Sequence, residues 1–300
     1  MNGSILCAEV EHEVYFGKFI SKLSEKFQPL QIFCFYKISS LEKKQGCFRS
    51  ERNSFSCDYG LLLVTATATR IDYEVQDYAN SNFTGGMITV ICHSNESVWN
   101  AIKSNSRFFK AVYGSGDLLY SHDGLLIKPY VIPYNPISAS LKALKHFHHR
   151  LPLAEGFLTG SAQCLAAESY SISVFMLHQA VEQACILLIR VHIAYRSEFH
   201  NLNRLLGLCQ SFSSAPYKTF FETAESRRLS AILFNSYSGA RYKSDFSVSR
   251  QDAESLFILV ESFMSVTKSM CNKKIGLLEE QKAFFTESQT TGETEPRFQA

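Results

Sequence analysis

Hydrophobic residues recur with helical spacing at the start of the chain and then in strand-like runs. Over residues 12–27, apolar side chains return every three or four positions, and Pro29 should end this helix. Three apolar segments of strand length follow, at residues 31–39, 59–67 and 87–93. The polar residues 40–56 predict a loop, and residues 98–112 predict a second helix. The first half is therefore expected to be an α+β domain.

From about Ser138 onward the pattern is helical almost throughout. Residues 172–195 are apolar nearly all round, which places this helix at the centre of a bundle. The polar, acidic residues beyond 275 predict a frayed tail. Further helices are expected at residues 153–167, 201–210, 220–235 and 252–270. We expect an α+β domain at 1–137, an all-α bundle at 138–275 and a flexible acidic tail at 276–300.

Charge is unevenly distributed along the 300 residues, although the net charge is only +2. Residues 1–138 balance 13 basic against 13 acidic side chains, whereas residues 139–275 hold 15 basic and 10 acidic ones, an excess of +5. This excess favours anionic ligands weakly and falls short of a dedicated DNA-binding domain. Random surface charge explains it equally well.

The nine cysteines are scattered, without a CxxC pair, and most lie in apolar segments. Buried reduced thiols are expected, rather than zinc ligands or disulfides. We expect no apolar run of the ~18 residues that a membrane span needs. The N-terminus lacks the basic start and cleavage site of a signal peptide. A cytoplasmic location without membrane contact is the expectation.

The order of elements in the first half resembles the minimal nucleotidyltransferase fold. Enzymes of that family have a Gly-Ser turn after the first strand and three carboxylates that bind two divalent ions. Here Tyr36-Lys37 stands at the Gly-Ser position, Gly60 at the second carboxylate and Thr89 at the third. Asp58 alone matches, as a remnant carboxylate or as a residue that caps a turn. The resemblance therefore implies the fold without its catalytic chemistry, and no metal site.

Three segments of the second half, residues 173–191, 199–206 and 236–248, together resemble the HEPN domain. They contain His-Gln-Ala-x-Glu from His178 to Glu182, a His-x-Leu segment at His200, and Ala-Arg-Tyr at 240–242. The resemblance is to the sacsin-like, nucleotidyltransferase-associated type. It implies a helical bundle that binds a nucleotide or RNA, and a homodimer.

His178 and Glu182 are four residues apart, so they are neighbours on one face of an otherwise apolar helix. A buried polar set of this kind needs internal hydrogen bonds. Three interpretations fit this set: a structural network, a ligand contact or part of a metal site.

Many HEPN proteins are ribonucleases with an Arg-x(4–6)-His motif. Arg196 and His200 are separated by three residues, one too few, and no histidine follows His200. These departures argue against the usual nuclease arrangement. His200 is expected to pack at a helix N-terminus or to contact a nucleotide.

Arg241, Tyr242 and Lys243 are expected in a turn and offer two cations and an aromatic face. Arginine can hold phosphate with two hydrogen bonds, and tyrosine can stack on a base. Lys243 stands where a proline is common in the family. The alternative is that Arg241 forms a salt bridge with Glu182 or Asp245 and ties helices together.

These residues predict a non-catalytic nucleotide- or RNA-binding protein without a cofactor. Its expected contacts are Arg241, Tyr242, Lys243, Arg196, His200, His178 and Glu182. The alternative is a divergent HEPN ribonuclease of a toxin–antitoxin or defence system. The histidines among residues 146–150 could suggest zinc, but they lack further ligands nearby and are expected on a partly exposed helix face.

Overall fold

The computed structural model describes residues 2–46 and 49–291, and the side chains of residues 9–41 and 55–287 among them. The chain divides into two compact units, Met1–Tyr134 and Asn135–Ala300. The domain boundary expected at residues 137–138 lies three residues beyond this division.

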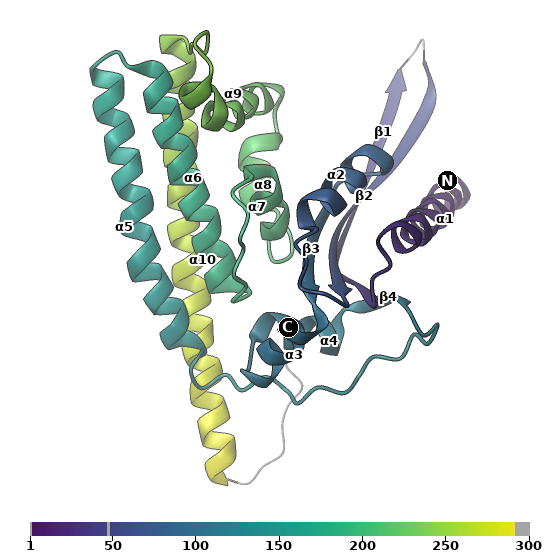
Figure 1. Ribbon diagram of the computed structural model, residues 1–300. Helices are drawn as coiled ribbons and strands as arrows, with labels where there is room; N and C mark the ends of the chain where they lie inside the picture. The colour runs from purple at the N-terminus through teal and green to yellow at the C-terminus, as the bar shows by residue number, and fades with distance from the viewer. Residues whose placement is uncertain (1, 47–48, 292–300) are drawn as a thin grey trace. The chain divides into compact units, whose positions relative to one another are not determined.

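The N-terminal unit contains a four-stranded mixed sheet with helices (Figure 1). The strands lie in the order β3-β2-β1-β4; β2 and β3 are parallel, and β1 is antiparallel to both β2 and β4. This arrangement confirms the α+β class. In chain order the elements are α1 (Asn2–Phe27), β1 (Gln31–Gly46), β2 (Arg49–Thr65), α2 (Asp72–Asn82), β3 (Ile88–Ser94), α3 (Asn95–Lys103), α4 (Arg107–Ser115) and β4 (Asp117–Ser121).

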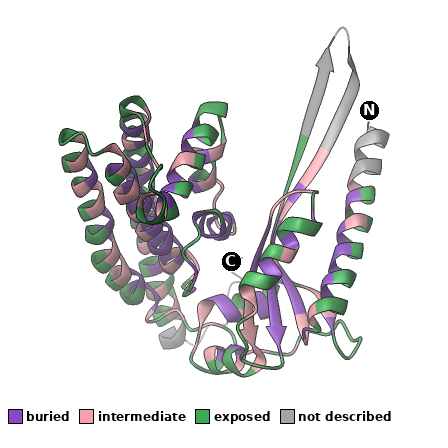
Figure 2. Cartoon of the chain, turned by 45° about the horizontal axis from the view of Figure 1, so that its top comes forward, coloured by how far each residue is buried: buried purple, intermediate pink, exposed green. Residues whose placement is uncertain are grey.

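Helix α1 covers the sheet with the apolar face that its sequence predicts. Phe19 and Leu23 are buried, and the ring of Phe16 stacks on Tyr59 of β2 with centroids 3.8 Å apart. Gln28 has a positive φ of 46°, and Pro29 follows it, so the helix ends at Phe27 as predicted. Figure 2 shows this buried side of α1 against the buried strands.

Several details of this unit differ from the sequence prediction. The loop expected at residues 40–56 is wrong, because β1 continues to Gly46 and β2 begins at Arg49, with pairs such as Leu41 and Phe55. Backbone hydrogen bonds hold a hairpin extension together without an apolar face, so hydropathy does not reveal it. The single helix expected at 98–112 is two helices, α3 and α4, divided where Asn105 has φ of 59°. Helix α2 and strand β4 were not expected.

The C-terminal unit is all helical in the residues described, which confirms its class. Helices α5, α6 and α10 run side by side (Figure 1), and α6 is the central one. Its residues Leu177, Val181 and Leu188 are completely buried, as its apolar circumference predicts. The elements are α5 (Ala139–Ala166), α6 (Tyr170–His192), α7 (Leu202–Cys209), α8 (Ala215–Phe221), α9 (Ala224–Tyr242) and α10 (Arg250–Thr291).

The helix boundaries are less well predicted. Helix α5 begins at Ala139, well before the expected start at residue 153, and runs through Pro152. The helix expected at 220–235 is divided between α8 and α9. Helix α10 continues to Thr291, so the prediction of a frayed tail is wrong for residues 276–291; residues 292–300 lie outside the described residues.

One helix in the described part of the chain, α6, is long and apolar enough to cross a membrane by length and composition alone. The expectation that no segment reaches this limit is therefore wrong. However, 72% of its apolar stretch is buried inside the protein. The core helix of a helical bundle also meets these criteria of length and composition.

Candidate functional site

In the N-terminal unit, the residues at the three nucleotidyltransferase positions are neighbours across the sheet. Tyr36 of β1 is paired with Gly60 of β2, and Gly60 is paired with Thr89 of β3. The hydroxyl of Tyr36 donates a hydrogen bond of 3.2 Å to Oγ1 of Thr89. The Tyr36 ring lies so close over Gly60 that a Cβ there would overlap it. An aromatic side chain therefore fills the space beside the positions where metal-binding carboxylates are expected.

Asp58, the remnant carboxylate, has a structural contact. Its Oδ1 accepts a hydrogen bond of 2.7 Å from the backbone N–H of Met87, just before β3 begins. The carboxylate thus fixes the segment that enters β3. This agrees with the interpretation of Asp58 as a residue that satisfies a turn.

In the bundle, the carboxylate of Glu182 and the imidazole of His200 form a hydrogen-bonded pair. Nδ1 of His200 lies 2.8 Å from Oε1 of Glu182; the Glu182 side chain is 5% exposed and that of His200 is 63% exposed. An ionised carboxylate can only accept hydrogen bonds, so Nδ1 carries the proton and donates it. The pair leaves the second ring nitrogen of His200, Nε2, for another partner.

His178 lies one helical turn before Glu182 and is buried. Its Nδ1 is 3.2 Å from the side-chain amide of Gln179, and its ring packs against Tyr237 of α9 with centroids 5.2 Å apart. Burial, together with the positive charges of Arg241 and His200, lowers the pKa of His178 to about 4. His178 is therefore neutral near pH 7 and lies close to the side chains of Arg241 and His200.

Arg241 lies in the last turn of α9, not in a turn after the helix as expected. Its Nε donates a hydrogen bond of 2.9 Å to the carbonyl oxygen of Tyr237, and its guanidinium lies 3.8 Å from the centre of the Tyr237 ring. The ring of Tyr242, which is 76% exposed, is 4.8 Å away. Within the described residues Arg241 makes no ion pair with Glu182 or Asp245, so that alternative is wrong.

These contacts bring five residues together, which we call the His200 site: His178, Glu182, His200, Tyr237 and Arg241. Four of them are predicted from the sequence. Tyr237 is the one missed, although its position four residues before Arg241 on the same helix would have indicated the contact. Tyr242 and Lys243 are exposed beside Arg241 at the end of α9.

Among the residues that the structure describes, no contact joins Arg196 to this group. It is exposed in the segment between α6 and α7, and its charge acts on Arg190 near the end of α6. The short spacing to His200 therefore does not produce an arginine–histidine pair.

No group of three metal-binding side chains occurs among the described residues, and the histidines at 146–150 lie on α5. The cysteines whose side chains are described are all free thiols, as expected: Cys34, Cys57, Cys92, Cys164, Cys185, Cys209 and Cys271. Cys7 and Cys47 lie outside the described side chains.

Residues 148–270 match the family model of the HEPN domain. The match begins within α5, ends within α10 and includes every residue of the His200 site. The C-terminal unit therefore contains a HEPN domain, as its three motifs indicate, whereas the N-terminal unit lies outside the match. No curated protein matches the chain.

Proposed function

We propose that this protein binds a nucleotide or RNA, without catalysis, through the His200 site of its HEPN domain. The observation that carries the proposal is the convergence of Arg241 and His200 on buried His178 and half-buried Tyr237. Helix α6 supplies the buried residues His178 and Glu182, while the side chains of His200 and Arg241 remain exposed.

The exposed groups have the chemistry that a nucleotide requires. The guanidinium of Arg241 is held at Nε by the Tyr237 carbonyl, which leaves its terminal nitrogens for a phosphate. His200 is held at Nδ1 and can present Nε2 to the same phosphate or to a ribose hydroxyl. The exposed ring of Tyr242 offers a surface on which a base can stack. Lys243, next in the chain, adds a further positive charge.

The N-terminal unit is proposed to be a nucleotidyltransferase-like domain that lacks transferase chemistry. The contact between Tyr36 and Thr89 and the close cover of Gly60 support this role. A two-metal mechanism needs several carboxylates in one place, and Asp58 is engaged with Met87. We further propose a cytoplasmic homodimer, since HEPN bundles often pair; light scattering of the purified protein would test the dimer.

One observation favours the alternative, a divergent ribonuclease. A buried carboxylate that orients an exposed histidine is an arrangement suited to acid–base catalysis, and the Glu182–His200 pair has it. A second cation on the same site, Arg241, could neutralise the phosphate under attack. The binding function is preferred because the nuclease spacing and a later histidine are missing.

Calorimetry with nucleoside mono-, di- and triphosphates and a short RNA would test the binding function. We expect Arg241→Gln to lower the affinity for the bound ligand about tenfold or more, because it removes a charge-assisted hydrogen bond. Arg250→Gln is the matched control, because Arg250 is exposed on α10 and pairs with Glu254. Binding by none of these ligands would contradict the proposal. Cleavage of labelled RNA that His200→Gln abolishes would establish the ribonuclease instead.

A further inference from the structure

A second group of basic side chains lies between α5 and α6, outside the His200 site. It consists of Arg150 on α5, Arg190 in the last turn of α6, and Arg196 in the segment after it; we call these three the arginine cluster. His146 lies one turn before Arg150 on the same face of α5.

Two hydrogen bonds fix how the antiparallel helices face each other. Near one end, the hydroxyls of Ser161 and Ser173 are 2.8 Å apart, and further along, the guanidinium of Arg150 donates to the side-chain oxygen of Gln183. Because the helices are antiparallel, each residue further along α6 lies opposite a residue one position earlier in α5. Arg190 follows Gln183 by two turns, so its backbone lies opposite α5 near Ala143, about one turn from His146.

The cluster has no internal counter-charge. Nε of Arg190 is buried and has no hydrogen-bond partner. Among the described residues, no carboxylate forms an ion pair with Arg150, Arg190 or Arg196. Natural proteins pair buried charges or bind an ion beside them, so the buried Nε of Arg190, with the charges of Arg150 and Arg196 nearby, needs an explanation.

The electrostatic effects agree with this geometry. Burial lowers the pKa of Arg190, and the nearby charges of Arg150 and Arg196 lower it further. Burial is also the largest cause that lowers the pKa of His146. Four nearby basic side chains lower it further, namely Arg190, Arg150, His149 and Lys145. The fold therefore holds these groups together against their mutual repulsion, which an anion would relieve.

We propose that the arginine cluster binds a phosphate group, as a site separate from the His200 site. Guanidinium forks match the oxygens of a phosphate, and three of them suit a di- or triphosphate better than a single carboxylate. The bond from Arg150 to Gln183 holds one fork in place, and Arg196 can close over the anion because it is exposed in a segment without helical structure. Either a free nucleotide or an RNA backbone supplies a phosphate of this chemistry.

Calorimetry with inorganic pyrophosphate at constant ionic strength tests the site. Arg196→Gln is the main variant, because Arg196 is exposed and makes no hydrogen bond that the fold depends on. We expect pyrophosphate to bind the wild type and to bind Arg196→Gln and Arg150→Gln about tenfold more weakly. Arg227→Gln, on α9 and outside both sites, should bind it like the wild type. The pKa of the His146 imidazole, followed by NMR through its Cε1 proton, should rise when pyrophosphate is bound.

Absence of pyrophosphate binding to the wild type would overturn the proposal, and so would equal binding by Arg196→Gln. A loss with Arg241→Gln alone would place the anion at the His200 site and would overturn it too. Failure of Arg241→Gln to affect nucleotide binding, by contrast, would contradict only the proposed function. Competition of pyrophosphate with adenosine triphosphate, or with an RNA hexamer that has hydroxyl ends, identifies the source of the phosphate.

Discussion

The buried carboxylate of Glu182 holds the exposed imidazole of His200 through a hydrogen bond of 2.8 Å at Nδ1. The two residues are 18 positions apart and come from α6 and the start of the α7 segment. A buried carboxylate that loses its partner retains its desolvation cost, so Glu182 depends on His200 for its hydrogen bond.

We expect His200→Ala to lower the free energy of unfolding by about 1–3 kcal/mol, because it leaves the Glu182 carboxylate buried without its partner. Glu182→Gln removes that charge, so His200→Ala should cost much less in its background. Urea denaturation of the wild type, both single variants and the double variant gives a coupling energy, expected at about 1–2 kcal/mol. A coupling energy near zero would show that the pair does not contribute to the fold.

His178 should make the stability depend on pH. Its pKa in the folded protein is about 4, lowered from 6.5 first by burial and then by Arg241 and His200. Between these values the unfolded chain takes up a proton that the folded chain excludes, so the free energy of unfolding falls as the pH drops from 6.5 to 4. The loss should approach roughly 3 kcal/mol and be absent above pH 6.5.

The comparison of wild type with His178→Gln at pH 7, 5.5 and 4.5 isolates this contribution from that of the carboxylates. The variant should lose less stability than the wild type over this range. A pKa of His178 above 6.5, measured from its Cε1 proton by NMR, would contradict the expectation.

Gly60→Ala should destabilise the N-terminal unit, because the new Cβ would overlap the Tyr36 ring and crowd Phe35. Overpacking of this kind costs about 1–3 kcal/mol. In a Tyr36→Leu background the cost should be smaller, since the ring is gone. Gly17→Ala is the control: nothing lies within 4 Å of its Cβ position in α1, so it should be neutral or stabilising. Equal effects of the two glycine variants would show that Tyr36 does not fill the site.

The sequence predicts those features that burial imposes on side chains. The α1 face, the three apolar strands and the central helix α6 are predicted correctly, because each is buried and its residue types repeat with the element's period. The same logic fails where backbone pairing acts alone, as in the polar hairpin beyond Ser39, and where a helix stays exposed, as in α10 beyond residue 275.

Site residues follow a similar division. His178 and Glu182 are predicted as neighbours because helix geometry fixes side chains four residues apart. Arg196 and His200 are equally close in sequence, but the segment between α6 and α7 is irregular, so spacing does not determine which way each points. The meeting of His178 with Tyr237 depends on how α6 and α9 pack, which no local pattern contains. The arginine cluster was missed for the same reason.

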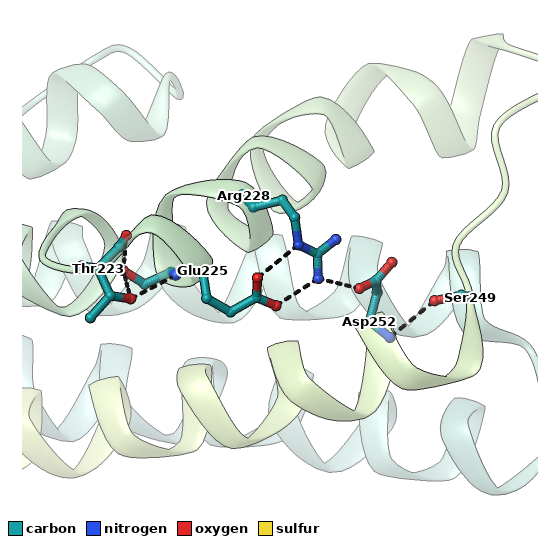
Figure 3. Close-up of polar contacts among 6 residues, drawn as sticks. Thr223, Glu225, Arg228, Ser249 and Asp252 are labelled. Carbon is teal, nitrogen blue, oxygen red and sulfur yellow. Dashed lines mark hydrogen bonds and ion pairs between the residues drawn. The ribbon is translucent and has the colours of Figure 1, made fainter.

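The first turn of α9 should depend on its capping box. Oγ1 of Thr223 accepts a hydrogen bond of 3.0 Å from the N–H of Ser226, and Oγ of Ser226 accepts one of 3.1 Å from the N–H of Thr223 (Figure 3). We expect Thr223→Ala to lower the free energy of unfolding by about 1 kcal/mol, equally at low and high salt. Thr219→Ala, which removes an exposed hydroxyl within α8, is the control and should change it less.

Arg228 should contribute a small stabilisation that salt removes. Its guanidinium joins Glu225, one turn away on α9, to Asp252 at the start of α10 (Figure 3). The pair is exposed, so Arg228→Gln should lower the melting temperature slightly at low salt and not at all in 1 M NaCl, where screening acts within ~3 Å.

The pH dependence of Arg228→Gln distinguishes an ion pair from lost packing. Hydrogen bonds from Arg228 lower the pKa of Glu225 below 4.5 and that of Asp252 below 3.8. A carboxylate whose pKa is lowered by folding stabilises the protein at pH values above its pKa in the unfolded chain. This stabilisation is lost as the pH falls through its pKa in the folded protein. The gap in melting temperature between wild type and Arg228→Gln should therefore persist from pH 7 to 5 and close at lower pH. A gap that is the same at pH 3 and in 1 M NaCl would mean that Arg228 stabilises the α9–α10 contact through its alkyl chain rather than its charge.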